Sequence, residues 1–169
     1  MEEDFEGAIP HFQAAENDRK FTESCRYHIL ESKFMLKDYS YVNTYGPEIY
    51  SQMSKEYAPQ TARILSESHF AANLPTQAQY YYELYSVGAV NITAKDNFYA
   101  GMIAYTLKSY EKAIGSFSKI ASTKDSLGQS AYYHIGQCYI SLKNKHKAQE
   151  AFKYAAVGSF DRAIKEDAY

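Results

Sequence analysis

The 169-residue sequence predicts an all-α fold in which antiparallel helix pairs repeat along the chain as an α-solenoid. Within each segment apolar residues recur at intervals of three, four and seven, the period of an amphipathic helix. Two columns of residues also recur at steps of about 35 residues. One column contains small or aliphatic residues and the other is mostly aromatic: Ala8, Val42, Ala78, Ala113, Ala148, and four residues later Phe12, Gly46, Tyr82, Phe117, Phe152. Such a period fits one helix, a turn and a second helix.

The predicted helices lie at 3–17, 21–36, 39–56, 59–73, 76–88, 95–107, 110–122, 127–142, 145–157 and 160–169. The predicted organisation is one array: 3–20 as the second helix of a partial repeat, 21–57 a repeat, 58–92 a degenerate repeat, 93–126 and 127–159 repeats, and 160–169 the start of a further repeat. Such a chain opens and ends inside a repeat, so we expect an excerpt of a longer array whose end faces promote self-association.

Small and aromatic residues at fixed positions are expected to set how closely the two helices of each pair pack. A one-carbon side chain in the Ala column lets two helices approach closely, and the aromatic residue four positions later fills the wider gap. Gly101 and Gly136 share one register in the first helices, and because glycine costs a helix interior about 1 kcal/mol relative to alanine, this recurrence predicts close backbone packing. Pro47, which follows Gly46, is expected to kink or split its helix because it removes an interior hydrogen bond.

These columns resemble the tetratricopeptide repeat family. The resemblance is specific in the last two repeats, at Gly101, Tyr110, Ala113, Phe117 and Ile120, and at Tyr132, Ile135, Gly136, Tyr139, Ala148, Phe152 and Ala155. The earlier repeats depart from the pattern: Val42 and Gly46 replace Ala and Phe, Leu30 and Ser66 replace Gly, and Pro75 replaces the aromatic residue. The resemblance implies a right-handed superhelical array whose first helices line a concave groove.

Composition and motifs exclude several function classes. A formal net charge of -2 gives no basic footprint for nucleic acid, and no apolar stretch is long enough for direct membrane insertion. Cys25 and Cys138 are not spaced as in a zinc motif or a disulfide framework, so we expect them to be small buried hydrophobic residues. The five histidines form no metal pair, and His69 is expected in a hydrogen-bonded core or groove position. With no glycine-rich phosphate loop, the sequence predicts neither a cofactor, nor a metal, nor catalysis.

The prediction that remains is a protein-binding surface. The ligand-facing positions that the family resemblance implies are Tyr27, Glu31 and Phe34; Arg63, Glu67 and Phe70; Phe98, Met102 and Tyr105; and Tyr133, Gln137 and Ile140. Aromatic walls with a few charges suit an extended or helical peptide, although the same aromatics also serve ordinary helix packing, Tyr105 above all. A clamp for a terminal carboxylate, known in some members, is disfavoured because Lys and Asn are missing from these columns.

Two other functions stay open. The array is also compatible with a structural spacer or self-assembly module, or with a regulatory docking arm of a larger enzyme or envelope-associated protein. The tyrosine-rich composition resembles bacterial envelope-associated repeat proteins in style, and both cytoplasm and periplasm fit the sequence.

Overall fold

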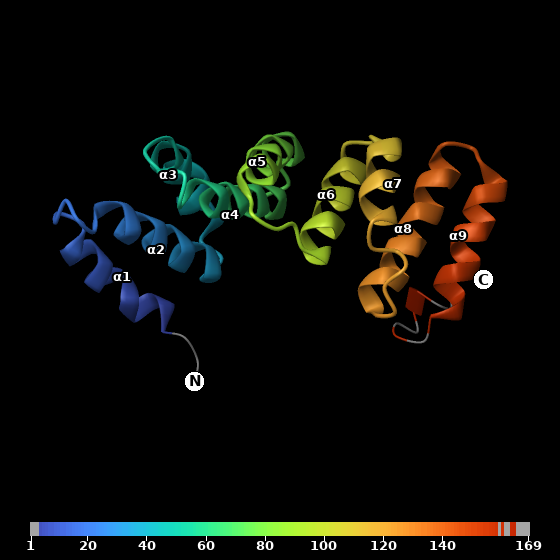
Figure 1. Cartoon of the computed structure of the whole chain (residues 1–169), viewed down its shortest axis with the longest axis horizontal. Coiled ribbons are helices and arrows are strands. Elements are labelled where there is room, and N and C mark those ends of the chain that lie inside the picture. Colours follow the sequence, from blue (N-terminus) through green and yellow to red (C-terminus); the bar gives the residue numbers. More distant parts are fainter. Residues whose placement is uncertain (1–3, 159, 161–162, 165–169) are drawn as a thin grey trace. The chain divides into compact units, whose positions relative to one another are not determined.

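The computed structural model describes residues 4–158, 160 and 163–164. In this part of the chain it contains nine helices and no strand, which confirms the predicted all-α fold. The helices are α1 (Phe5–Ala15), α2 (Thr22–Met35), α3 (Tyr39–Ser51), α4 (Ala58–Ala71), α5 (Pro75–Gly88), α6 (Ala94–Thr106), α7 (Tyr110–Ser118), α8 (Ser126–Ser141) and α9 (Lys145–Val157) (Figure 1).

The chain divides into two compact units, Met1–Val90 and Asn91–Tyr169. We call them unit 1, which contains α1 to α5, and unit 2, which contains α6 to α9. The predicted helix at 160–169 falls almost entirely on residues outside the described part of the chain.

Four tight turns repeat the period of the sequence. Lys37, Asn73, Lys108 and Lys143 each have a positive φ, between 57° and 60°, directly after the C-cap of a first helix. In each turn the next amide reaches back five residues to a helix carbonyl, as in Ser109 N to Ala104 O (2.8 Å) and Asn144 N to Tyr139 O (2.9 Å). This is the Schellman geometry, which satisfies carbonyls that the helix end leaves open. The repeated turn joins α2 to α3, α4 to α5, α6 to α7 and α8 to α9.

Each helix pair packs against the next within its unit. In unit 1 the contacts run α1 to α2, α2 to α3, α3 to α4 and α4 to α5, with an additional contact between the first helices α2 and α4. In unit 2 the order is α6 to α7, α7 to α8 and α8 to α9, and the first helices α6 and α8 again touch. The repeat therefore places successive first helices beside each other in both units.

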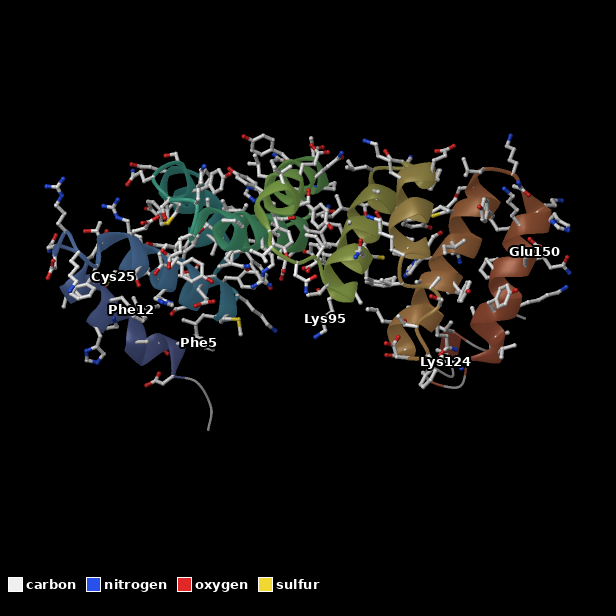
Figure 2. The ribbon with its side chains drawn as sticks, viewed as in Figure 1. Phe5, Phe12, Cys25, Lys95, Lys124 and Glu150 are labelled. Carbon is white, nitrogen blue, oxygen red and sulfur yellow. The ribbon has the colours of Figure 1, made fainter. Side chains whose placement is uncertain are left out.

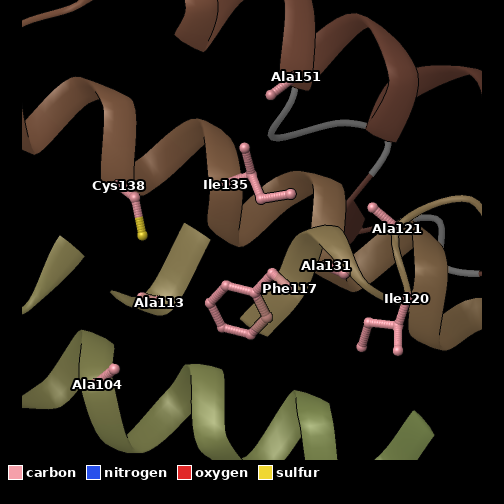
Figure 3. Close-up of a cluster of buried hydrophobic side chains, with 9 residues drawn as sticks. All are labelled: Ala104, Ala113, Phe117, Ile120, Ala121, Ala131, Ile135, Cys138 and Ala151. Carbon is pink, nitrogen blue, oxygen red and sulfur yellow. The ribbon is translucent and has the colours of Figure 1, made fainter. Parts of the chain in front are cut away.

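The predicted glycine contact is confirmed in unit 2. A Cβ built on Gly101 would lie 2.4 Å from Cε1 of Phe117, and one on Gly136 would lie 2.4 Å from Cε1 of Phe152. Each aromatic ring therefore covers bare backbone of the first helix in its own repeat. Figure 3 shows the fully buried Phe117 ring between α6 and α8, beside Ile135.

In unit 1 the repeat of α2 and α3 fills the same space with the sizes exchanged. Leu30 stands in the glycine column and Gly46 in the aromatic column. A Cβ on Gly46 would lie 2.5 Å from Cδ2 of Leu65 and 3.4 Å from Cδ1 of Leu30, so leucine side chains occupy the volume that a phenylalanine takes in unit 2. Leu30, Leu65 and Val42 are all fully buried.

Of the two effects expected of Pro47, a kink or a split of its helix, the split is wrong. Helix α3 runs without interruption from Tyr39 to Ser51 with Pro47 inside it, and then ends before the predicted residue 56. An interior proline costs about 3 kcal/mol through a lost hydrogen bond and a clash with the preceding turn. Tertiary context overrides such local preferences, and directly before the proline Gly46 packs against Leu65 of α4.

Candidate functional site

The candidate site of unit 1 is formed by the side of α2 and α4 that the sequence singled out. We call this surface the unit-1 face; it contains Tyr27, Glu31, Phe34, Arg63, Glu67 and Phe70. Residues four and seven apart lie on one side of a helix, and α2 and α4 are in contact, so the two triplets run next to each other. Phe34, Phe70, Glu31, Arg63 and Glu67 are all partly exposed, which leaves both apolar and charged atoms accessible.

Tyr27 contributes to the wall of this face from a buried position. Its ring is 9% exposed and lies 5.3 Å from the ring of Tyr57, and its hydroxyl donates a 3.0 Å hydrogen bond to Oε1 of Glu31. Burial, followed by the nearby carboxylate of Glu31, raises the pKa of Tyr27 to about 12. Tyr27 therefore stays protonated and fixes the carboxylate of Glu31 in place.

The one arginine of the unit-1 face is already paired. Nη1 of Arg63 lies 3.0 Å from Oε1 of Glu67 on the next turn of α4, and Nε of Arg63 donates to Oε1 of Gln60. An arginine engaged by two neighbours on its own helix is poorly placed to hold a terminal carboxylate of a ligand. This geometry agrees with the expectation that a carboxylate clamp is disfavoured.

The equivalent surface of unit 2 is uncharged. This unit-2 face contains Phe98, Met102 and Tyr105 of α6 and Tyr133, Gln137 and Ile140 of α8. Gln137 Nε2 donates a 3.0 Å hydrogen bond to the hydroxyl of Tyr133, the same spacing of four residues that links Tyr27 to Glu31 in unit 1. Ile140 is 51% exposed. Both faces carry three aromatic residues, but the unit-1 face also has Glu31, Arg63 and Glu67, whereas the unit-2 face has no charged residue.

Part of the unit-2 face also serves the core. The Phe98 ring packs edge-on against Phe117 (5.5 Å between centroids) and against His134 (5.7 Å). The Tyr105 ring lies 5.9 Å from both Tyr110 and His134. Phe98 and Tyr105 are therefore anchored to the interior and present only their outer edges to a ligand.

His69 and the two cysteines are buried in the interior. His69 is buried, as expected, with Nδ1 2.7 Å from the carbonyl oxygen of Leu65 and its ring stacked on Tyr81. Cys25 and Cys138 are free and buried, and burial raises the pKa of Cys138 to about 11, so its thiolate is disfavoured. In the described part of the chain, no group of three or more His, Cys, Asp or Glu side chains is arranged to hold a metal ion.

A cavity between α1 and α2 was missed by sequence reasoning. It measures about 370 Å³ and adjoins the unit-1 face through Glu31; it is lined by Asp4, Phe5, Ala8, Phe12, His28, Glu31, Ser32 and Met35. Figure 2 shows Phe5 and Phe12 on the side of α1 that faces α2. The sequence columns gave no signal for this cavity, because Ala8 shares its column with Val42, Ala78 and Ala113, and only the structure shows that Ala8 stays partly exposed while these counterparts are fully buried.

Helix pairs joined by one repeated turn, with first helices side by side, define this chain as a repeat protein of the α-solenoid class. Residues 129–156 match the family model described as tetratricopeptide repeat, and the helices of the described residues are those of a tetratricopeptide-like array. Neither the curated proteins nor the solved structures gave a match to the chain. Tetratricopeptide repeats generally act as protein–protein interaction modules without catalysis of their own. Among the described residues, no helix is both long and apolar enough to cross a membrane.

Proposed function

We propose that this chain is a non-catalytic interaction scaffold that binds a peptide or a protein segment along its first-helix faces. The observation that carries the proposal is the pairing of first helices within each unit, which aligns partly exposed aromatic and aliphatic side chains on neighbouring helices. Phe34 of α2 and Phe70 of α4 are the matching positions in unit 1, and Ile140 presents the most exposed side chain of the unit-2 face.

The physical basis is the anchoring of a ligand by a few apolar contacts. Truncation of a central aromatic anchor in an interface costs about 2 kcal/mol or more, whereas most surrounding contacts contribute little. Phe34 also packs against Tyr39 at 6.0 Å between centroids, which holds the ring in one orientation before a ligand arrives. A preordered anchor loses less entropy on binding.

The test is a binding measurement with a defined partner. Affinity capture with the full chain identifies candidate partners, and titration calorimetry with a purified candidate then compares wild type with Phe34→Ala/Phe70→Ala. We expect the double variant to bind at least about thirtyfold more weakly, which corresponds to about 2 kcal/mol. Tyr80→Ala is the matched control, because Tyr80 is an exposed aromatic residue of α5 outside either face. Equal losses in both variants, or no loss in either, would reject the first-helix faces as the binding surface.

A second candidate function, self-association, is supported by one specific observation. Phe152 of α9 remains partly exposed beside a cavity of about 520 Å³, whereas its counterpart Phe117 is fully buried under α8. If this surface joins copies of the chain, the sedimentation coefficient rises with protein concentration, and Phe152→Glu abolishes the rise. A concentration-independent monomer would remove this candidate.

A further inference from the structure

We propose that the cavity between α1 and α2 is a binding site for an arginine side chain carried by the partner segment. The inference rests on the proposed function, because the cavity adjoins the unit-1 face, and it adds the chemical class of the ligand. Three properties of the cavity support it: the shape and chemistry of its walls, the two carboxylates of its rim, and the lack of arginine or lysine in its lining.

The walls suit the stem and the plane of a guanidinium-bearing side chain. Phe5, Phe12 and Met35 supply apolar surface for three methylene groups, and Ala8 leaves room between them. The imidazole of His28 stacks on Phe12 with 5.2 Å between centroids and 19° between their planes, so the cavity is bordered by two nearly parallel rings. A guanidinium stacks on such aromatic surfaces more readily than an ammonium does. The volume of about 370 Å³ falls within the range of specific ligand sites, about 300 to 1,000 Å³.

The polar groups of the cavity are acceptors of hydrogen bonds. Asp4 and Glu31 are the two charged residues of the lining, and the nearly buried Ser32 adds a hydroxyl. One oxygen of Asp4 accepts from the amide of Gly7 at 2.8 Å, and one oxygen of Glu31 accepts from Tyr27. Because an ionised carboxylate has about four lone-pair positions, each group retains acceptor capacity for a forked donor. The contact with Tyr27 holds Glu31 in place for such a donor.

The lining of the cavity contains no arginine or lysine beside these carboxylates. By comparison, Glu16, Asp38 and Glu67 of unit 1 are paired with arginine or lysine at 2.7 to 3.1 Å. Within the described residues, the only ion-pair partner of Glu31 is His28 at 3.2 Å, which is cationic only when protonated, and Asp4 has no such partner. A cationic side chain of a ligand would therefore supply the positive charge that complements the two carboxylates at the rim of this apolar cavity.

Unit 2 supplies a natural reference for this arrangement. Gln137 stands where Glu31 stands in unit 1 and also hydrogen-bonds a tyrosine hydroxyl four residues earlier, although Gln137 donates to Tyr133 whereas Glu31 accepts from Tyr27. Glu31→Gln therefore has a native precedent in this chain and removes charge without removing the local hydrogen bond. Asp4→Asn is similarly conservative, because asparagine caps a helix about as well as aspartate. The double variant removes the charge of the site and leaves its structure in place.

The experiment is an NMR titration of the isotope-labelled full chain with a capped pentapeptide that has one arginine between alanines. We expect saturable amide shifts centred on Phe5, His28 and Met35, and affinity that falls as salt is added. The same peptide with citrulline, which is neutral and of equal shape, and the arginine peptide with Asp4→Asn/Glu31→Gln should each bind at least about tenfold more weakly, the ratio for one lost charge-assisted hydrogen bond. Glu6→Gln, an acid of the first turn of α1 outside the lining, is the matched control and should bind like wild type.

The outcomes separate this inference from the proposed function. Equal affinity for the arginine and citrulline peptides, or shifts that map elsewhere, overturns the arginine site. So does a double variant that keeps its dispersed spectrum and binds like wild type. If the arginine site fails while Phe34→Ala/Phe70→Ala still weakens a purified partner, the scaffold function stands without it. If the arginine peptide binds as expected and the face variant has no effect, the cavity is a site in its own right and the face is not.

Discussion

Three glycines of unit 2 provide a quantitative test of how its helices pack. Gly101, Gly136 and Gly115 all lie inside helices, so replacement by alanine gains the same backbone propensity, about 1 kcal/mol. They differ in what the added methyl group meets. At Gly115 nothing lies within 4 Å, whereas at Gly101 and Gly136 the new Cβ would lie 2.4 Å from a phenylalanine ring.

The two crowded sites differ in whether the ring can move. Phe117 opposite Gly101 is fully buried, with the His134 ring stacked on it at 5.3 Å and Phe98 against its edge. Phe152 opposite Gly136 is partly exposed and can turn outward. Overpacking a rigid core costs about 1 to 3 kcal/mol. After subtracting the propensity gain, we expect Gly101→Ala to lose up to about 2 kcal/mol, Gly136→Ala to be near neutral, and Gly115→Ala to gain about 1 kcal/mol.

The measurement is urea unfolding of the full chain, followed by circular dichroism at the helix band, with thermal unfolding as a second probe. In a protein of this size 1 kcal/mol corresponds to a midpoint shift of about 2 to 4 °C. The order Gly115→Ala, Gly136→Ala, Gly101→Ala, from most to least stable, is the expected result. Stability of Gly101→Ala equal to or above that of Gly136→Ala would refute the argument from the mobility of the ring.

Two further predictions concern the turns and the core of unit 2. Lys143→Gly should stabilise the chain by about 1 kcal/mol, because a left-handed backbone costs an L-residue about 1 to 2 kcal/mol. Lys112→Gly, inside α7, is the control and should destabilise the chain by about 1 kcal/mol. Thermal unfolding measures both changes, and a lower midpoint for Lys143→Gly than for wild type would contradict the prediction. Burial lowers the pKa of His134, so the unfolded chain binds a proton that the folded chain releases, and stability should fall as the pH drops below about 6.5. Urea unfolding at pH 7 and at pH 5 measures this loss of stability, and His134→Phe should reduce it. A loss as large in His134→Phe as in wild type would contradict the role given to His134. His146→Asn is the control, because the side chain of His146 is exposed.

The repeat was predictable because its signals are local and periodic. Columns of similar residues about 35 positions apart located the helices. A Leu-Lys pair also recurs at three of the four left-handed turns between paired helices, at 36–37, 107–108 and 142–143. The expected split of the helix at Pro47 was wrong, because tertiary context overrides the local preference of a single residue.

The candidate site was predictable in position and less so in detail. Helical spacing is enough to place Phe34 and Phe70 on adjacent first helices. It does not reveal that Tyr27 turns inward against Tyr57 while its hydroxyl holds Glu31, because side-chain direction depends on the neighbouring helix. The cavity between α1 and α2 could not be predicted from the sequence for the same reason. Its lining combines residues of two helices, and its volume depends on how closely their side chains pack.

An exchange of sizes in one repeat explains why strict sequence patterns fade while the fold persists. In unit 2 the first helix supplies glycine and the second supplies phenylalanine, as in Gly101 with Phe117; in α2 and α3 of unit 1 the first helix supplies Leu30 and the second supplies Gly46, with Leu65 of α4 also against Gly46. Either combination fills the gap between the helices, whereas two large residues would clash and two small ones would leave a cavity. The fold thus constrains a summed volume across two helices, while a repeat pattern records residue identities one column at a time. A degenerate repeat such as the one at Leu30 and Gly46 can therefore depart from the pattern at both positions and still preserve the packing that aligns α2 with α4.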